Sequence, residues 1–204
     1  MVGFIRRLFR QEPESIPVMV RQRFARIATA PGRDKRRIGP KVAKELGYDP
    51  EEIDRLPGSI TESFAGVGNP LSLGEVRPGE TVLDLGSGAG LDSVLAARRA
   101  GPGGQVIGID MTPEMVEKAR RNVQAVGLSN VEFLNAPVEA IPLGDDTADV
   151  ALCNGLFNLC PDKPGALAEV HRVLKPGGRF LIADILLEDR VTPGEVARKG
   201  AWSD

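Results

Sequence analysis

The chain has 204 residues, of which 42% are hydrophobic and 26% charged, and its net charge is −2. This length and composition fit one globular domain with an N-terminal extension. No run of fifteen apolar residues occurs, which excludes a segment long enough to span a bilayer. The opening MVGFIRRLFRQ has too short an apolar stretch for a signal peptide, and two cysteines are too few for a disulfide framework, so we expect a cytoplasmic protein.

Charge is divided unevenly along the chain. Residues 1–48 hold 12 Lys or Arg against 4 Asp or Glu, a net of +8, whereas residues 49–204 hold 14 against 24, a net of −10. A basic arm can attract nucleic acid, a membrane or an anionic substrate, but such charge is more often a solvated helix face. We therefore expect no nucleic-acid partner, and the arm can instead dock on the acidic remainder of the chain.

The first third of the chain is predicted to be short helices. Residues 16–29 form a plausible helix, residues 30–40 a Pro- and Gly-marked loop, and residues 41–48 a short helix stopped by Gly47. Another short helix is expected over 50–57. The predicted organisation is a helical extension or cap over 1–69 and a second domain over 70–204.

From Thr81 onward, strands and helices alternate. Strands are predicted at 81–85, 105–110, 131–135, 148–154 and 177–186, with helices at 92–100, 112–126 and 163–174. Thr112 can cap the second of these helices, with Pro113 at its first position. This alternation predicts an α/β fold with right-handed crossovers and a parallel sheet.

The run VLDLGSGAG over residues 82–90 is the most informative motif. Gly86, Gly88 and Gly90 let the main chain approach a ligand between a strand and a helix. Asp84 stands beside this turn, where it suits a cation better than a pyrophosphate, and the loop contains no Lys or Arg. Asp110 ends the next strand, where a carboxylate can accept both ribose hydroxyls. The motif therefore predicts a cationic nucleoside ligand.

Over roughly residues 40–204, the chain resembles the class I S-adenosylmethionine-dependent methyltransferases. The resemblance rests on VRPGETVLDLGSGAG, VIGIDMTPEM, ARRNVQAVGLSNVEF and HRVLKPGGRFLIADI. Within them it is most similar to the arsenite methyltransferase-like branch, through GVGNPLSLGEVRPGETVLDLGSGAGLDS and NLCPDKPGALAEVHRVLKPGG. The resemblance implies S-adenosyl-L-methionine as cofactor and a Rossmann-like sheet of strand order 3-2-1-4-5.

The sheet of that family ends in an antiparallel hairpin, which we expect to be missing here because the sequence ends at Asp204. The edge of the fifth strand would then be open to a partner or a second copy. The resembling proteins continue after WSD with Cys-Ile-Ala-Gly-Ala. One hypothesis is therefore a UGA selenocysteine codon after Asp204, which sequencing of the locus tests: UAA or UAG with no such continuation contradicts it. A natural truncation and an annotation error are the alternatives.

The resemblance also implies roles for individual residues. The methionine part of the cofactor is expected at the glycine loop, Asp110 is expected at the ribose and Met111 over the adenine. Pro137 stands where relatives often place an acid for the adenine amine, while Val138 and Glu139 can still line that pocket. The cofactor-binding residues predicted in this way are Asp84, Gly86, Ser87, Gly88, Gly90, Asp110, Met111, Val138, Glu139 and Asn154.

The methyl acceptor is expected at the end of the fourth strand, with Asn154, Asn158 and Cys160 as catalytic candidates. Cys153 is more typical of a small buried hydrophobe. Where arsenite methyltransferases carry a Cys in Gly-Cys-Gly-Asn-Pro, this chain has Val67, and where they read Ser-Asn-Cys it has Gly155. Three thiolates cannot come from two cysteines, so arsenite conflicts with these residues, and no residue is assigned to a metal.

The function predicted is methyl transfer from S-adenosylmethionine to a small molecule, with arsenite or a related soft nucleophile as acceptor. In-line displacement depends mainly on positioning and needs little acid–base chemistry. The only histidine, His171, is expected at a helix end. A quinone or other carbon acceptor is the enzyme alternative, and a non-catalytic cofactor-binding fragment is the second. An NAD dehydrogenase is disfavoured by Asp84.

Overall fold

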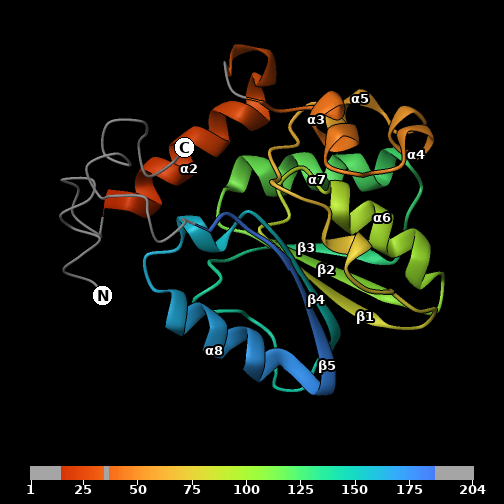
Figure 1. The fold of residues 1–204 in the computed structure, drawn as a ribbon, viewed down its shortest axis with the longest axis vertical. Helices are drawn as coiled ribbons and strands as arrows, with labels where there is room; N and C mark the ends of the chain where they lie inside the picture. The colour runs from red at the N-terminus through yellow and green to blue at the C-terminus, as the bar shows by residue number, and fades with distance from the viewer. Residues whose placement is uncertain (1–14, 35–36, 187–204) are drawn as a thin grey trace.

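The computed structural model of the protein describes residues 15–34 and 37–186, and its centre is a five-stranded sheet (Figure 1). All pairings are parallel, and the strand order is β3-β2-β1-β4-β5. The predicted α/β fold and strand order are therefore confirmed. The strands are β1 (Thr81–Leu85), β2 (Gln105–Asp110), β3 (Val131–Asn135), β4 (Ala148–Asn154) and β5 (Leu174–Ala183).

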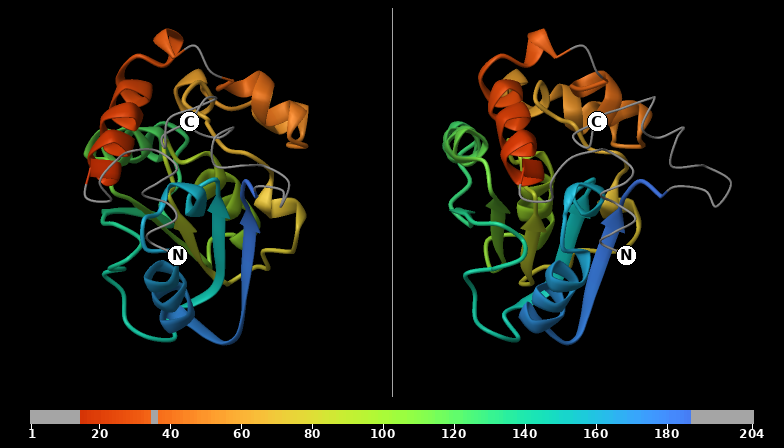
Figure 2. Two further views of the ribbon diagram at one scale, coloured as in Figure 1. Left: turned by 60° about the vertical axis from the view of Figure 1, so that its left-hand side comes forward. Right: turned by 90° about the vertical axis from the view of Figure 1, so that its left-hand side faces the viewer.

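Helices cover both faces of the sheet (Figure 2). One face carries α6 (Leu91–Ala100) and α7 (Pro113–Ala125), and the other carries α8 (Lys163–Val173). Side chains alternate along each strand, so Val82 packs with α6 while Leu83 packs with α8. The same alternation on β4 directs Cys153 toward α8 and the next side chain, Asn154, toward α6. Whether a residue occupies an odd or even position in its strand thus decides which face of the sheet its side chain lies on and which polar groups it can contact.

The N-terminal part forms short helices on the α6 and α7 side of the sheet. They are α2 (Ser15–Thr29), η1 (Pro31–Arg33), α3 (Pro40–Glu45), α4 (Pro50–Asp54), α5 (Gly58–Thr61) and η2 (Pro70–Ser72). Pro residues at the first positions of α3 and α4, and the Asp49 carboxylate accepting from the Glu51 N–H, explain where these helices begin. None of the helices in the described part of the chain is long and apolar enough to cross a membrane.

One hydrophobic core runs from this N-terminal part into the sheet. Ile53 and Ile60 belong to the same buried cluster as Val82 and Leu95. Burying apolar surface in a shared cluster makes the stability of each part depend on the other. The two-domain division at 69/70 stays a prediction, and the packing is continuous across it.

The buried ammonium group of Lys118 ties three segments together. Its Nζ donates to Glu62 Oε1 at 2.6 Å, to Ser63 Oγ at 2.8 Å and to the Ala28 carbonyl at 3.2 Å. Ser63 Oγ in turn donates to the Ile27 carbonyl at 3.1 Å. A cation at these last carbonyls of α2 also complements the helix dipole. These bonds fix the C-terminal end of α2 on α7.

The strand β5 begins earlier than predicted, at Leu174. Ala148 pairs with Leu174 but Val150 pairs with Arg179, so the register shifts where Gly177 adopts a φ of +78°. Because of this irregularity, the Pro-Gly-Gly segment lies within β5, whereas the prediction placed the start of the strand inside that segment. Residues 187–204, on which the expected lack of a final hairpin and an open β5 edge depend, lie outside the described residues.

Candidate functional site

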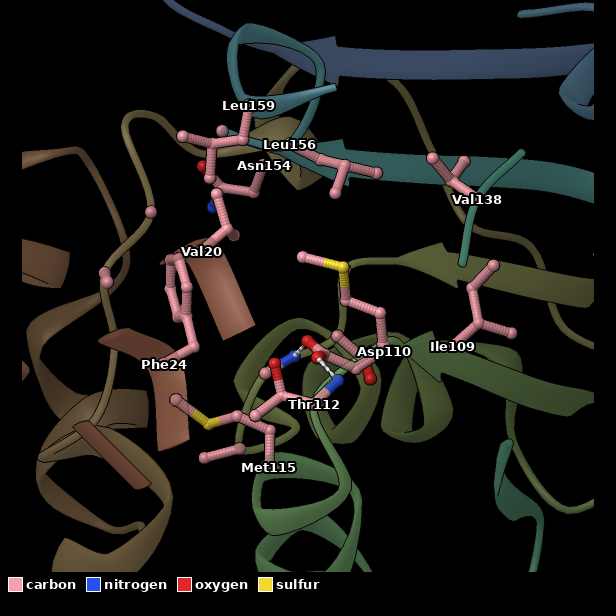
Figure 3. A pocket seen from close by; sticks show the side chains of 18 of the residues that line it. Val20, Phe24, Ile109, Asp110, Thr112, Met115, Val138, Asn154, Leu156 and Leu159 are labelled. Atoms are coloured by element: carbon pink, nitrogen blue, oxygen red, sulfur yellow. Dashed lines mark hydrogen bonds between the residues drawn. The ribbon is translucent and has the colours of Figure 1, made fainter. Parts of the chain in front are cut away.

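A cavity of about 300 Å³ opens at the carboxyl ends of the strands. Figure 3 shows it between Asp110, Thr112 and Met115 on one side and Asn154, Leu156 and Leu159 on the other, with Val20 and Phe24 forming a third wall. Its lining comes from the glycine loop, the ends of β2 and β4, the loop after β3, and the N-terminal helices. This is the edge where open α/β sheets bind their ligands.

Asp110 is held by two main-chain donors in this cavity. Its Oδ2 accepts from the Gly88 N–H at 3.0 Å, and its Oδ1 accepts from the Thr112 N–H at 2.8 Å (Figure 3). Burial raises the pKa of this carboxyl, and the two N–H groups oppose that rise. Each carboxylate oxygen keeps lone pairs for a ligand, so the group is pre-oriented to accept a pair of hydroxyls.

The glycine loop takes a conformation that favours glycine at two positions lining the cavity. Gly86 has a φ of +70° and Gly88 a φ of +53°. The N–H groups of Gly86 and Ser87 both donate to the Ile109 carbonyl at 2.9 Å, which fixes the loop against β2. Ser87 lines the cavity, and its Oγ is buried with no hydrogen-bond partner among the described residues. Gly90 lies behind the loop, where a side chain would meet the Phe133 ring.

Asp84 does not line the cavity. It is 2% exposed and faces α6, where its Oδ2 accepts from Ser93 Oγ at 2.5 Å. Burial raises its pKa, and the neighbouring charge of Asp92 raises it further. Asp92 is the carboxylate of this region that does line the cavity, from the first turn of α6. The sequence analysis missed Asp92, although its position two residues after Gly90 was visible.

Asn154 lines the cavity, but both ends of its amide are engaged by the protein. Its Oδ1 accepts from the N–H groups of Val67 at 2.8 Å and Gly68 at 3.1 Å. Its Nδ2 has two hydrogens, which are shared among three acceptors: the Gly68 carbonyl at 2.9 Å, Tyr48 Oη at 3.0 Å and Asp92 Oδ2 at 3.1 Å. The amide therefore attaches the 66–68 loop to the end of β4.

An apolar slot lies beside Asp110. Met111, Val138 and Glu139 all line the cavity as predicted for the adenine end, together with Ile109, Ala136 and Leu156. Thr112 lies in the same wall, and its hydroxyl makes no cap bond to α7. Thr112 Oγ1 is instead buried, and it acts on the neighbouring Asp110 carboxyl, where it helps to oppose the rise in pKa that burial causes. The sequence analysis assigned this hydroxyl only to helix capping.

The three predicted catalytic residues are not brought together. Cys160 lines the cavity, and burial raises the pKa of its thiol to about 12. Asn158 is not among the lining residues, and its main-chain N–H donates to Asp184 Oδ1 at 3.3 Å. Cys153 is fully buried on the α8 side, as predicted for a small hydrophobe. The only thiol at the cavity is therefore uncharged near neutral pH.

The helix α2 supplies a wall that the sequence analysis treated only as part of a cap. Pro17, Val20 and Phe24 line the cavity. Val20 and Phe24 lie beside Leu159, with which they form a small apolar cluster (Figure 3). Their spacing along the helix places them on one face. An apolar helix face is equally typical of core packing, so the sequence carried no signal that this face borders a ligand site.

The charged residues of the lining are all acidic. They are Asp92, Asp110 and Glu139, and no Lys, Arg or His from the described residues lines the cavity. The exposed His171 lies on α8, at the predicted helix end. Such a site attracts a cation and repels a pyrophosphate or phosphate. The cavity thus has the charge predicted from the glycine loop, although Asp92 contributes it in place of Asp84.

Residues 77–201 match the sequence model of a family described as "Methyltransferase domain". An arsenite methyltransferase of Halobacterium salinarum is 39% identical over 191 residues, which cover 86% of this chain and 49% of that protein. A ubiquinone/menaquinone biosynthesis C-methyltransferase of Escherichia coli is 40% identical over 111 residues, covering 53% of this chain and 44% of the relative. The chain thus spans about half the length of these curated relatives.

Two solved structures resemble this one. An arsenic(III) S-adenosylmethionine methyltransferase from Chlamydomonas reinhardtii matches with a TM-score of 0.54 and 36% identity, covering 70% of this chain and 48% of that one. A SAM-dependent methyltransferase from Aquifex aeolicus matches with a TM-score of 0.50 and 31% identity, covering 69% of each chain. Both are similar in sequence as well as in fold.

Proposed function

Because this chain belongs to the methyltransferase domain family, we propose that it is an S-adenosylmethionine-dependent methyltransferase with a small-molecule acceptor. The observation that supports this cofactor is the lining of the cavity, where the charged residues from the described part of the chain are all acidic. S-adenosylmethionine brings a sulfonium and an amine, and both favour carboxylate surroundings. The two free hydroxyls of its ribose match the pre-oriented carboxylate of Asp110.

The lining residues fit the parts of this cofactor in order. Asp110 would hold the ribose, and Met111 with Val138 would enclose the adenine. The main chain of Gly86–Gly88 would follow the methionine part, whose amine would lie toward Asp92. The methyl group would then face Asn154 and Cys160, where the wall formed by α2 closes the cavity.

When bound, S-adenosylmethionine supplies a methyl group activated by the positive sulfur. In-line transfer to the acceptor's electron pair would form a bond to the methyl carbon and break the carbon–sulfur bond, whose electrons would stay on sulfur. The protein's part is positioning, because holding reactants in line at about 3 Å accounts for most of the rate gain. Asn154 contributes by fixing the 66–68 loop, and the apolar side chains of α2 exclude water.

For the acceptor we propose a small soft nucleophile, with trivalent arsenic as the leading candidate. The support is the similarity to arsenite methyltransferases. The two positions where the resembling enzymes carry Cys are adjacent, since a Cβ on Gly155 would lie 3.2 Å from Val67 Cγ1. Neither position carries a thiol here, so Cys160 is the thiol left to contact a soft acceptor, and a three-thiolate cage is not part of the proposal.

A carbon acceptor such as a quinol is the second candidate. The apolar wall of Val20, Phe24 and Leu159 suits a ring, and the C-methyltransferase relatives are 40% identical over the part they share with this chain. Carbon methylation usually needs a base, and Glu139 is our candidate, because it lines the cavity and its charge acts on the Cys160 thiol. We also propose a cytoplasmic location, supported by two free cysteines. A dimer contact on β5 stays a prediction.

Calorimetric titration with S-adenosylmethionine and, in parallel, NAD tests the cofactor. We expect saturable binding of S-adenosylmethionine alone, and binding of NAD alone would overturn the proposal. Methyl transfer is then measured with arsenite plus a thiol, with the thiol alone and with a short-chain quinol. Transfer to arsenite supports the soft acceptor, and transfer only to the quinol replaces it. Binding without transfer to any of the three would identify a non-catalytic cofactor-binding fragment.

A further inference from the structure

Tyr48 stands directly behind the cavity wall, in the loop between α3 and α4. It is the only tyrosine of the chain and is 3% exposed. Its ring meets the ring of Phe64 edge to face, with centroids 5.3 Å apart and planes at 76°. Phe64 lines the cavity, whereas Tyr48 does not. The ring of Tyr48 is therefore fixed, and its hydroxyl has a defined direction.

That hydroxyl is bonded to two of the polar lining residues. It donates to Asp92 Oδ1 at 2.6 Å and accepts from Asn154 Nδ2 at 3.0 Å. Burial and the adjacent Asp92 carboxylate raise the pKa of Tyr48 far above its ordinary value, so the phenol stays protonated and is the donor. A hydrogen bond to an ionised acceptor is about twice as strong as one between neutral groups.

The bonds continue from Tyr48 to the loop that borders the acceptor end. Asn154 Nδ2 also donates to Asp92 Oδ2, while Asn154 Oδ1 receives the N–H groups of Val67 and Gly68. The fit is close, because a Cβ on Gly66 would lie 2.5 Å from Asn154 Nδ2. Tyr48 is thus bonded directly to Asp92, the carboxylate that would face the cofactor's amine. Through Asn154 it is also connected to the 66–68 loop, which would border the acceptor.

We propose that Tyr48 is a positioning residue, which holds Asp92 and Asn154 in one network and so links the cofactor's cationic end to the 66–68 loop. The inference rests on the proposed function, because it assumes a cationic ligand beside Asp92. Tyr48 itself does not line the cavity, so it would contact neither the cofactor nor the methyl acceptor. Its effect is to keep Asp92 ionised and to keep the Asn154 amide turned toward the loop.

The charges around Asp92 explain why a single hydroxyl matters. Burial raises the pKa of Asp92, and the Asp84 carboxyl of β1 lies close enough for the two charges to interact. The hydrogen bonds from Tyr48 and Asn154 and the charge of Arg99 on the same helix oppose that rise. Removing the Tyr48 hydroxyl therefore raises the pKa of Asp92, and a protonated Asp92 no longer attracts a cation.

The test compares Tyr48→Phe with the wild type and with Thr61→Val, using calorimetric titration with S-adenosylmethionine from pH 5 to pH 9. Tyr48→Phe keeps the ring against Phe64 and removes only the hydroxyl. Thr61→Val is the matched control, since it removes a buried hydroxyl of the same N-terminal part whose bond goes to the Gly58 carbonyl. The ligand's own titration is the same for all three proteins and cancels in the comparison.

We expect Tyr48→Phe to bind S-adenosylmethionine about 10-fold more weakly toward the acid end of this range, with the difference shrinking toward its alkaline end. The midpoint of its affinity profile moves to higher pH, while Thr61→Val follows the wild type. A role in packing alone would weaken binding equally at every pH. Tyr48→Phe with an unmoved midpoint would overturn the inference, whereas a wild type that binds no S-adenosylmethionine would overturn the proposed function instead.

Two further measurements do not depend on the pH profile. The double variant Tyr48→Phe/Asp92→Asn should bind S-adenosylmethionine no more weakly than Asp92→Asn alone, because both changes act on the charge of Asp92. Additive losses of affinity would contradict this.

Hydrogen exchange of the Val67 and Gly68 amides should accelerate in Tyr48→Phe but not in Thr61→Val. Equal protection in both variants would show that the hydroxyl does not hold the loop.

Discussion

The carboxylate of Asp110 and the main-chain N–H of Gly88 are 3.0 Å apart and joined by a hydrogen bond. The bond runs from the glycine loop to the end of the neighbouring strand, so the two parts of the predicted nucleoside site hold each other in place before a ligand enters. A site ordered in this way loses less conformational entropy when a ligand binds, which favours affinity.

Replacing Asp110 by Asn tests this carboxylate. The variant keeps the size of the side chain but loses the charge that accepts both main-chain and ligand donors. We expect the binding of S-adenosylmethionine to weaken by about 1.5–3 kcal/mol, the range for a hydrogen bond to a charged group. Calorimetry measures the change, and Glu132→Gln on the exposed side of β3 is the control. Unchanged affinity in Asp110→Asn would contradict a ribose-binding role.

The sheet and the glycine loop between β1 and α6 could be predicted because their signals are local. Glycine spacing, strand and helix periods and the acid at the end of β2 all act over a few residues, and the strand order came with the resemblance. The strand order and the family are confirmed. The start of β5 was predicted too late, because a Pro-Gly-Gly segment normally ends a strand and here a register shift accommodates it.

Lys118→Met tests the attachment of α2. The variant keeps an unbranched side chain but removes three hydrogen bonds, to Glu62, Ser63 and the Ala28 carbonyl. We expect about 2–3 kcal/mol less stability in denaturant unfolding, because the partners left behind are partly buried. Lys44→Met is the control: its partner Asp54 is largely exposed, and such surface pairs contribute about 0–1 kcal/mol. An equal loss of stability in the two variants would show that Lys118 contributes no more than an exposed ion pair does.

The two thiols should be slow to react in the folded protein. Burial raises the pKa of both Cys153 and Cys160 to about 12, so at pH 8 only about one thiol in ten thousand is ionised. Alkylation followed by mass spectrometry should therefore label neither residue in buffer and both in denaturant. Rapid labelling of Cys160 in the folded protein would reveal a thiolate at the cavity and strengthen the case for a soft acceptor.

The loop that carries Val138 and Glu139 should loosen in acid. Glu169 on α8 accepts from the Ile141 N–H at 2.9 Å and from Arg172, whose hydrogen bonds lower the pKa of Glu169 to about 2. A lowered pKa stabilises the folded state above the ordinary value of 4.5, and this contribution is lost as the pH falls toward about 2.

The measurement is thermal unfolding of Glu169→Gln and the wild type between pH 7 and pH 2. We expect the variant to be less stable at pH 7 and the two proteins to converge at the acid end. Glu75→Gln serves as control, because Glu75 and its partner Arg77 are both largely exposed and 3.7 Å apart. A stability difference that stays constant with pH would exclude the ionised Glu169 as its source.

The polar network of the site could not be predicted from the sequence. Tyr48, Asp92 and Asn154 come from three elements separated by many residues, and no spacing rule connects them. Asp84 was expected beside the ligand because of its place before the glycines. The alternation of β1 instead turns it toward α6, where Ser93 satisfies it. Such assignments depend on which side chains the tertiary packing brings into contact.

In the 66–68 loop, the contacts that hold the loop in place are separate from the side chain that gives the wall its chemical character. Within the 66–68 loop, the hydrogen bonds of Asn154 go to main-chain atoms of Val67 and Gly68 and not to a side chain. The side chain at position 67, which faces Gly155, takes no part in that attachment. The chemical character of this wall can therefore drift by single substitutions while the scaffold stays intact, so relatives that share this arrangement can diverge in what they modify without first having to be rebuilt.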